Sequence, residues 1–188
     1  MAKVRVLAFD IGIKNFSFCL CEGGSTWKAF EVLQWERTEL KGTTNVDLLI
    51  ALDTVLNGIK LDFDAVEIEQ QPFCRSSTQL TCQLLAHSIF MFYSRQKKSV
   101  KFQHATNKFR CSNNPDFRQL AKTNKSIQGS ANYSTRKRYA IKFVTELIKN
   151  TPDSFSAEQS NYFINAFKQD DLADSLMIAL YHLQAKKK

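Results

Sequence analysis

No apolar run in this sequence is long enough to cross a membrane. The longest, Leu84 to Tyr93, is interrupted by His87 and Ser88, whereas a membrane-spanning helix needs about 20 apolar residues. We also expect no signal or transit peptide, because Met1 to Lys3 lead at once into a strand-like run. We therefore expect an intracellular protein, in the cytosol or nucleus, that makes no membrane contact.

Cysteine and histidine are few and scattered. The five cysteines are odd in number, and neither they nor the three histidines form a Cys-x-x-Cys pair or a Cys/His group. Disulfide frameworks and zinc sites depend on such groupings, so we expect neither of them here. The cysteines are interpreted as reduced thiols, most of them filling the core.

The chain has an excess of positive charge. With 26 basic and 18 acidic residues, the net charge is +8 and the isoelectric point is near 9.3. Such a field favours polyanionic partners, so carboxylates at the ends of apolar strands would repel the partner unless cations lie between them. This combination indicates metal-dependent phosphodiester chemistry. At 188 residues and 44% hydrophobic, the chain is expected to form a single domain over residues 1–188.

The order of the predicted elements indicates an α/β fold. Periodicity and turn residues predict strands at 3–10, 15–21, 27–35, 63–69 and 99–104. Helices are predicted from 45 to 56, from Ser76 or Ser77 to Arg95, from Ser134 to Lys149 and from 168 to 184, with a long polar loop over 106–132. This order resembles that of ribonuclease H-like domains, which have a mixed five-stranded sheet with helices on both faces.

Two acidic residues follow apolar strands. Asp10 ends the first predicted strand, and Glu69 ends the fourth, just before Pro72. If these strands are parallel neighbours, both carboxylates lie at one edge of the sheet. Turn formation is the alternative role for Asp10, and Glu67, two residues before Glu69, remains an alternative to it.

The last predicted helix carries two more acids. Asp171 and Asp174 are about 60° apart on one helix face, separate from the apolar stripe that includes Leu172 and Leu176. Asp170 suits a helix N-terminus, and a pairing of Asp170 with Asp174 is the second choice. Carboxylate oxygens favour hard cations, so we expect two Mg²⁺ ions per site, with Mn²⁺ as a possible replacement.

These motifs resemble those of a known family. Phe9-Asp10-Ile11-Gly12, Ile68-Glu69-Gln70-Gln71-Pro72 and Asp170-Asp171-Leu172-Ala173-Asp174-Ser175 are similar to the three acidic motifs of RuvC-like Holliday junction resolvases, particularly the form carried by poxviruses and related large DNA viruses. The resemblance implies a ribonuclease H-like homodimer with two magnesium ions per active site that nicks paired strands of a four-way DNA junction. It also implies that Asp10, Glu69, Asp171 and Asp174 are the metal ligands. A viral protein of this kind would work where viral DNA replicates, in the host cytoplasm.

Basic and aromatic residues complete the predicted DNA-binding site. Arg136, Lys137 and Arg138 begin a helix that resembles the DNA-facing helix of that family, although a solvated helix face is the usual interpretation of such a run. We expect phosphate contacts there, with Lys137 nearest the scissile phosphate and Lys125 as a weaker candidate. Phe73 is predicted to stack on a base beside the metals, or otherwise to cap the core.

The sequence therefore favours a dimeric, metal-dependent resolvase that leaves 5′-phosphate ends. The helix from Ser76 to Arg95 is apolar on more than one face and is the expected dimer seam. One alternative is a ribonuclease H-type nuclease that acts on RNA·DNA hybrids. The other is a non-catalytic module that binds DNA junctions, which would have no need for four carboxylates.

Overall fold

A computed structural model of the chain describes residues 3–24, 29–72, 76–111 and 130–185, without the side chains of 130–133 and 185. The strands are β1 (Val4–Asp10), β2 (Phe16–Gly23), β3 (Phe30–Thr38), β4 (Ala65–Glu69) and β5 (Ser99–Gln103). The α-helices are α1 (Asn45–Gly58), α2 (Ser77–Arg95), α4 (Ser130–Asn150), α5 (Ala157–Asn165) and α6 (Gln169–Ala185). Two short 3₁₀ helices, η1 (Asn107–Arg110) and η2 (Pro152–Ser154), complete the described elements.

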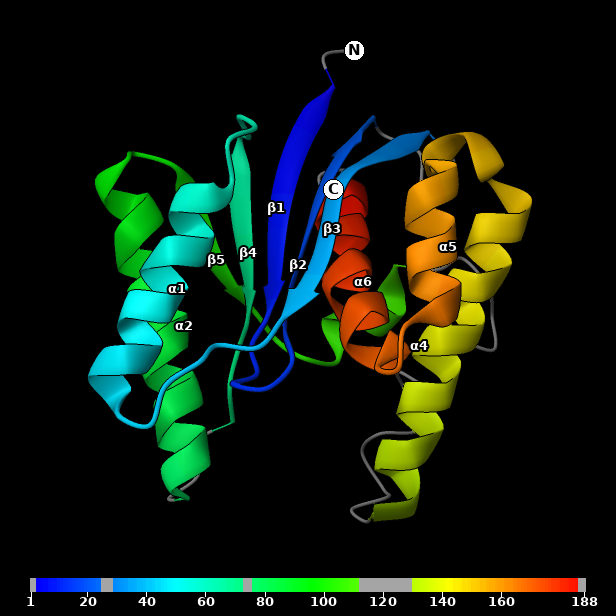
Figure 1. The fold of residues 1–188 in the computed structure, drawn as a ribbon. Helices are drawn as coiled ribbons and strands as arrows, with labels where there is room; N and C mark the ends of the chain where they lie inside the picture. Colours follow the sequence, from blue (N-terminus) through cyan, green and yellow to red (C-terminus); the bar gives the residue numbers. More distant parts are fainter. Residues whose placement is uncertain (1–2, 25–28, 73–75, 112–129, 186–188) are drawn as a thin grey trace.

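The five strands form one mixed sheet in the order β3-β2-β1-β4-β5 (Figure 1). β1, β2 and β3 form an antiparallel meander, in which Asp10 is opposite Ser17 and Phe16 is opposite Thr38. β4 joins the other side of β1 in parallel, and β5 is parallel to β4. The carboxyl ends of β1, β4 and β5 therefore lie at the same edge of the sheet.

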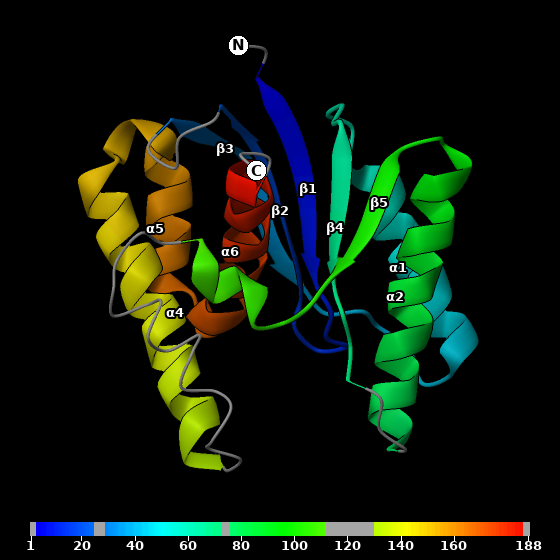
Figure 2. The same ribbon diagram turned by 180° about the vertical axis from the view of Figure 1, so that it is seen from behind.

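Helices cover both faces of the sheet, α1 and α2 on one side and α4, α5 and α6 on the other (Figures 1 and 2). The alternation along β1 explains this arrangement: Leu7 and Phe9 pack in the α1 and α2 layer, whereas Val6 and Ala8 pack in the α6 layer. A strand with apolar residues on both faces requires a cover on each. The mixed α/β architecture that the sequence predicted is thus confirmed.

α5 protects the free edge of β3. The Gln159 amide donates a hydrogen bond to the Val32 carbonyl at 2.9 Å, and the Arg37 backbone N–H donates one to the Tyr162 hydroxyl at 3.1 Å. Beneath them, Phe163 is buried and stacks on Trp35, with ring centroids 5.1 Å apart. These contacts fix α5 against both the sheet edge and the core.

The structure also corrects several predicted boundaries. α5 was not predicted, because only Phe163 of its nine residues is buried and the apolar pattern is weak; its signal was the Ser156 and Gln159 capping box. α4 begins at Ser130 rather than at Ser134, so its first turn belongs to the segment expected to be a loop, as does η1. β3 extends to Thr38 rather than ending at Trp35, because β2 continues to pair with it.

Within the described ranges, no helix combines the length and apolarity that a bilayer-spanning segment requires.

Candidate active site

Asp10 and Glu69 end adjacent parallel strands. The residues just before them, Phe9 and Ile68, are register partners, and both belong to the core under α1 and α2. Because side chains alternate along a strand, Asp10 and Glu69 are directed to the opposite face, toward α6. The two carboxylates meet at the carboxyl edge of the sheet, where ligand sites of α/β folds commonly form.

α6 brings two further carboxylates to this edge. Two hydrogen bonds anchor its first turn: the Ser17 hydroxyl donates to the Asp171 carbonyl at 2.6 Å, and the Trp35 indole N–H donates to the Leu172 carbonyl at 2.9 Å. Asp171 and Asp174 then line, with Asp10 and Glu69, a cavity of about 530 Å³. The structure thus brings together the four acids that the sequence singled out.

Lys108 lies among these acids and was missed by the sequence prediction. Its ammonium nitrogen is 2.8 Å from Glu69 Oε1 and 2.6 Å from Asp174 Oδ2, and the side chain is 7% exposed. η1, which carries Lys108, follows the carboxyl end of β5, so it reaches the same edge of the sheet. The available signal was the position of Lys108 shortly after a strand parallel to β4, but it was hidden in a polar segment that was interpreted as a loop.

The cluster concentrates negative charge in a buried place. Burial, followed by the nearby charge of Glu69, raises the pKa of Asp10 well above its ordinary value. Burial also raises the pKa of Asp174, although the Lys108 charge opposes this effect. For Glu69, burial acts in the same direction, but the Lys108 charge and hydrogen bonds to Asp10 and Lys108 outweigh it, so the pKa is lowered. The site therefore gains stability from any added cation.

Lys108 and Asp171 mark two places at which a cation fits among these carboxylate oxygens. The described side chains do not, as placed, form a preset group of three metal ligands, because the Lys108 ammonium bridges Glu69 and Asp174. Asp171 Oδ2 is buried without a hydrogen-bond partner among the described residues, and burial followed by the Asp170 charge raises the pKa of Asp171 to about 6. Carboxylate oxygens around a bridging ammonium, with one oxygen unsatisfied, fit an oxygen-ligated divalent cation.

The two alternative acids have other partners. Asp170 is buried and forms an ion pair with Lys137 of α4, and it is not among the described side chains that line the cavity. Glu67 lies deeper on β4, where its Oε1 is 2.6 Å from His182 Nδ1. The geometry thus favours Asp171 over Asp170, and Glu69 over Glu67, as walls of the cavity.

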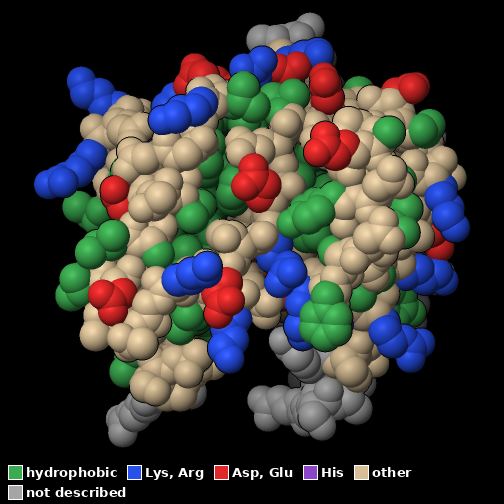
Figure 3. Space-filling view, viewed as in Figure 1, with side chains coloured by type: hydrophobic (Ala, Val, Ile, Leu, Met, Phe, Trp, Pro, Cys, Tyr) green, Lys and Arg blue, Asp and Glu red, His purple; other side chains and the backbone are tan. Residues whose placement is uncertain are grey.

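The predicted DNA-binding residues divide into three groups. Arg136 and Lys137 line the cavity from α4, whereas Arg138 is exposed and does not. Phe73 and Lys125 lie outside the described residues. In the space-filling view, Lys and Arg side chains gather around the hollow at the lower end of the molecule, the end at which β1 and β4 finish (Figure 3).

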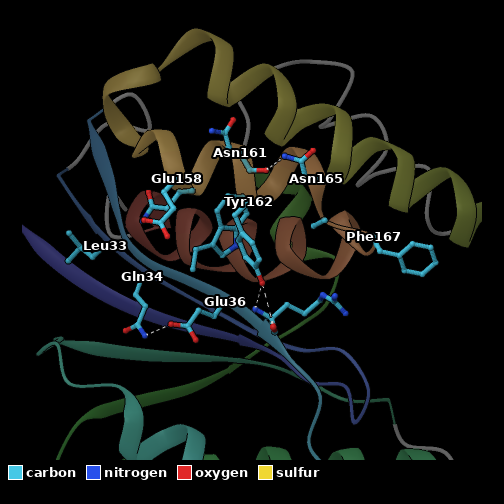
Figure 4. A pocket seen from close by; sticks show the side chains of 12 residues that line it. Leu33, Gln34, Glu36, Glu158, Asn161, Tyr162, Asn165 and Phe167 are labelled. Atoms are coloured by element: carbon cyan, nitrogen blue, oxygen red, sulfur yellow. Dashed lines mark hydrogen bonds between the residues drawn. The ribbon is translucent and has the colours of Figure 1, made fainter.

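A larger hollow, of about 1060 Å³, lies between β3 and α5 (Figure 4). The Tyr162 hydroxyl points across it to the backbone of Arg37, and Phe167 lines its rim, with the ring directed outward. Glu36 and Glu158 are the carboxylates on its walls, and Glu36 accepts a hydrogen bond from Gln34 at 2.7 Å. This hollow lacks the buried, converging acids of the smaller cavity, which we take as the candidate active site.

Comparisons at the sequence level find no match: no family model matches the chain, and no curated protein matches it. Solved structures do match over nearly the whole chain. The Fowlpox virus resolvase in complex with its substrate Holliday junction DNA superposes with a TM-score of 0.67 at 17% identity, covering 98% of this chain and 99% of that one. Another structure of the Fowlpox virus Holliday junction resolvase gives a TM-score of 0.65 at 16% identity, covering 97% of this chain and 99% of that one.

A bacterial protein matches in the same way. Thermus thermophilus RuvC in complex with a Holliday junction substrate gives a TM-score of 0.62 at 13% identity, covering 98% of this chain and 95% of that one. Identities this low establish the fold alone. The chain has the fold of the RuvC-like Holliday junction resolvases, and it superposes on the poxvirus structures with the higher TM-scores.

Proposed function

We propose that this protein is a Holliday junction resolvase, an endonuclease that hydrolyses phosphodiester bonds in paired strands of a four-way DNA junction. One observation carries the proposal: Asp10, Glu69, Asp171 and Asp174 converge with Lys108 in one cavity at the carboxyl edge of the sheet. The net charge of +8 and the shared fold with resolvases support it. Buried acids that repel phosphate are useful in such a chain only if they hold cations.

The four carboxylates would hold two Mg²⁺ ions, or Mn²⁺ in their place. Bound metal ions of this kind activate a water molecule and stabilise the charge that develops on the scissile phosphate. Asp10 and Glu69 are fixed by their strands, whereas Asp171 and Asp174 are fixed by the first turns of α6. Rigid strands and a helix hold such ligands more accurately than loops do.

Lys108 has a separate role in this proposal. Its ammonium lies 2.8 Å from Glu69 Oε1 and 2.6 Å from Asp174 Oδ2 and neutralises both. With these carboxylates holding divalent cations, its three N–H donors would be available to bind a phosphate oxygen of the substrate. Lys108 is therefore proposed as a catalytic residue beside the four acids.

The basic end of α4 would hold the DNA backbone. Arg136 and Lys137 line the cavity, and Arg138 is exposed one residue further along the helix. Contacts from such residues to phosphates position a nucleic acid without reading its sequence. Lys137 also pairs with Asp170, so it joins α4 to the helix that carries the acids. We propose that Lys137 lies nearest the scissile phosphate.

The protein is proposed to act as a homodimer, because symmetric cutting of two strands needs two sites related by a two-fold axis. α2 offers a suitable surface. Leu80 and Met91 are 52% and 54% exposed, and Leu84 lies between them at helical spacing. A stripe of this length in water is a common sign of an interface. Light scattering should give the mass of a dimer for the wild type, and Leu84→Glu should give a monomer. A monomeric wild type that cuts junctions would exclude this arrangement.

The proposed activity can be tested with three labelled substrates: a four-way junction, a plain duplex of the same sequence and an RNA·DNA hybrid, each incubated with Mg²⁺ or Mn²⁺. We expect paired nicks with 5′-phosphate ends in the junction alone, and none with Asp10→Asn. Cleavage of the hybrid instead would indicate a ribonuclease H-type enzyme. Tight junction binding without any cleavage would indicate a non-catalytic module.

A further inference from the structure

The turn between α5 and α6 carries a side chain that the fold leaves in water. Phe167 is 91% exposed, whereas Phe163, four residues earlier, is fully buried against Trp35. Burial of a phenylalanine side chain is favourable, and single exposed apolar residues are common. Exposure alone therefore does not indicate a role for Phe167, and its position and neighbouring residues must be considered.

The turn that presents Phe167 is tied on both sides. The Gln169 amide donates hydrogen bonds to the Phe163 and Ile164 carbonyls at 3.0 and 3.1 Å, and the Ala166 backbone N–H donates to the Phe163 carbonyl. On the far side, the Trp35 bond to the Leu172 carbonyl anchors α6. The ring is thus displayed from an ordered turn and points away from the body of α5 (Figure 4). Because the backbone of the turn is already ordered, little backbone freedom is lost when the ring binds.

Phe167 is also close to the candidate active site. It precedes Asp171 by four residues, which places the two Cα atoms at most about 14 Å apart. The ammonium of Lys168 is 5.7 Å from the centroid of the Phe167 ring, and Lys137 pairs with the neighbouring Asp170. An exposed aromatic ring with a cation beside it, four residues before an acid of the candidate active site, matches the stacking platforms that bind unpaired nucleobases.

We propose that Phe167, at the rim of the larger hollow and four residues before Asp171, stacks on an unpaired nucleobase of the DNA strand that leaves the candidate active site. This inference rests on the proposed function, since it assigns a contact to the substrate of that same site. The base would be exposed where strands exchange at the centre of a junction. The stack would hold the strand in register while Lys168 contacts its phosphates.

Binding and cleavage with three Phe167 variants test the proposal, with binding measured in Ca²⁺. Phe167→Ala should bind the junction about ten-fold more weakly than the wild type. Phe167→Leu, which keeps an apolar surface but no aromatic face, should lose as much, whereas Phe167→Trp should retain binding. Ile164→Ala, at a neighbouring position that is 57% exposed, is the matched control and should bind normally.

A photochemical experiment locates the contact. Junctions that carry 5-iodouracil on either side of the cut position should crosslink on irradiation to the peptide that contains Phe167. Wild-type binding by Phe167→Leu, or crosslinks that map elsewhere, would overturn the inference. So would a Phe167→Ala variant of altered oligomeric mass, because the ring would then be a contact between copies. Failure of the wild type to bind or cut junctions would instead overturn the proposed function.

Discussion

Two clusters of acids and bases lie on the same strand and the same helix, and they differ in the balance between the two. Glu69 of β4 and Asp174 of α6 share Lys108 at the wall of an open cavity. Glu67, two residues earlier on β4, is paired with His182, two turns later on α6, and both side chains are 7% exposed. The first cluster has more acids than bases, whereas the second pairs one acid with one base. Each contains a buried polar atom without a hydrogen-bond partner among the described residues, Asp171 Oδ2 and His182 Nε2, and Glu67 and His182 also line a hollow, of about 270 Å³. The comparison indicates that neither burial nor a nearby hollow marks the candidate site, but the convergence of several acids on one base does.

Removing a carboxylate from the first cluster, that of Glu69, Asp174 and Lys108, should have the largest effect. Asp174→Asn keeps the size of the side chain but weakens its hold on a cation, so junction cleavage should fall at least about 1000-fold, equivalent to about 4 kcal/mol of transition-state stabilisation. Junction binding should be unchanged or tighter, because one charge that repels phosphate is lost. Single-turnover cleavage and gel-shift assays measure the two quantities. Wild-type cleavage by Asp174→Asn would move the site elsewhere.

Removing Lys108, the base of the first cluster, should have the next largest effect. Lys108→Met leaves the acids without their counter-charge, so cleavage should fall roughly 100-fold. The metal-free variant should melt at a lower temperature than the wild type, because buried charges lose their partner. Mg²⁺ should then raise its melting temperature more than it raises that of the wild type, because the cation replaces the lost charge. Equal Mg²⁺ stabilisation of both proteins would show that Lys108 does not stand in for a cation.

The pair of Glu67 and His182 should affect stability rather than chemistry. His182→Ala leaves the buried Glu67 carboxyl group without its hydrogen-bond partner and should lower the free energy of unfolding by about 2 kcal/mol. Urea unfolding measures this loss, and Glu67→Gln in the same background should recover part of it by replacing the carboxyl group that lost its partner. The Mg²⁺ concentration for half-maximal cleavage should stay the same in the folded variants. A large shift in that concentration would mean that the two clusters act as one site.

The smallest effect concerns pH. Burial raises the pKa of Asp171 to about 6 from its ordinary value of 3.8. The folded protein therefore retains a proton there after the unfolded chain has lost it, and stability falls as pH rises between about 4 and 6. Full burial would make this about 3 kcal/mol, but the carboxyl is half-buried, so we expect roughly 1 kcal/mol.

Urea unfolding of metal-free wild type and Asp171→Asn at pH 4 and pH 6.5 gives the difference between the two proteins. The wild type should lose more stability across this range than the variant does. Parallel pH curves for the two proteins would place Asp171 in water rather than against the cavity.

The sequence was sufficient to predict the sheet and the four acids of the cavity. It was not sufficient to predict Lys108, which pairs with two of these acids, or the exposure of Phe167. Asp10 and Glu69 follow apolar strands, and Asp171 and Asp174 share a helix face, so local patterns reveal them. Lys108 is different, because its role depends on how far β5 and η1 extend past the edge of the sheet. The exposure of Phe167 is equally hidden, since it follows from the way in which α5 and α6 are tied.

The roles of the site residues stay a prediction until they are measured. The roles of Phe73 and Lys125 also stay predictions, since both residues lie outside the described residues.

The capped edge of β3 has a consequence for how this protein behaves at high concentration. Gln159 and Tyr162 of α5 occupy backbone groups that would otherwise accept another strand. β5, at the other edge, is five residues long and carries the exposed Lys101, and short, charged edge strands resist pairing. Sheet-to-sheet growth of the kind that produces fibrils is thus discouraged at both ends. Contacts between copies at high concentration are therefore expected to form through the helices rather than through the sheet edges.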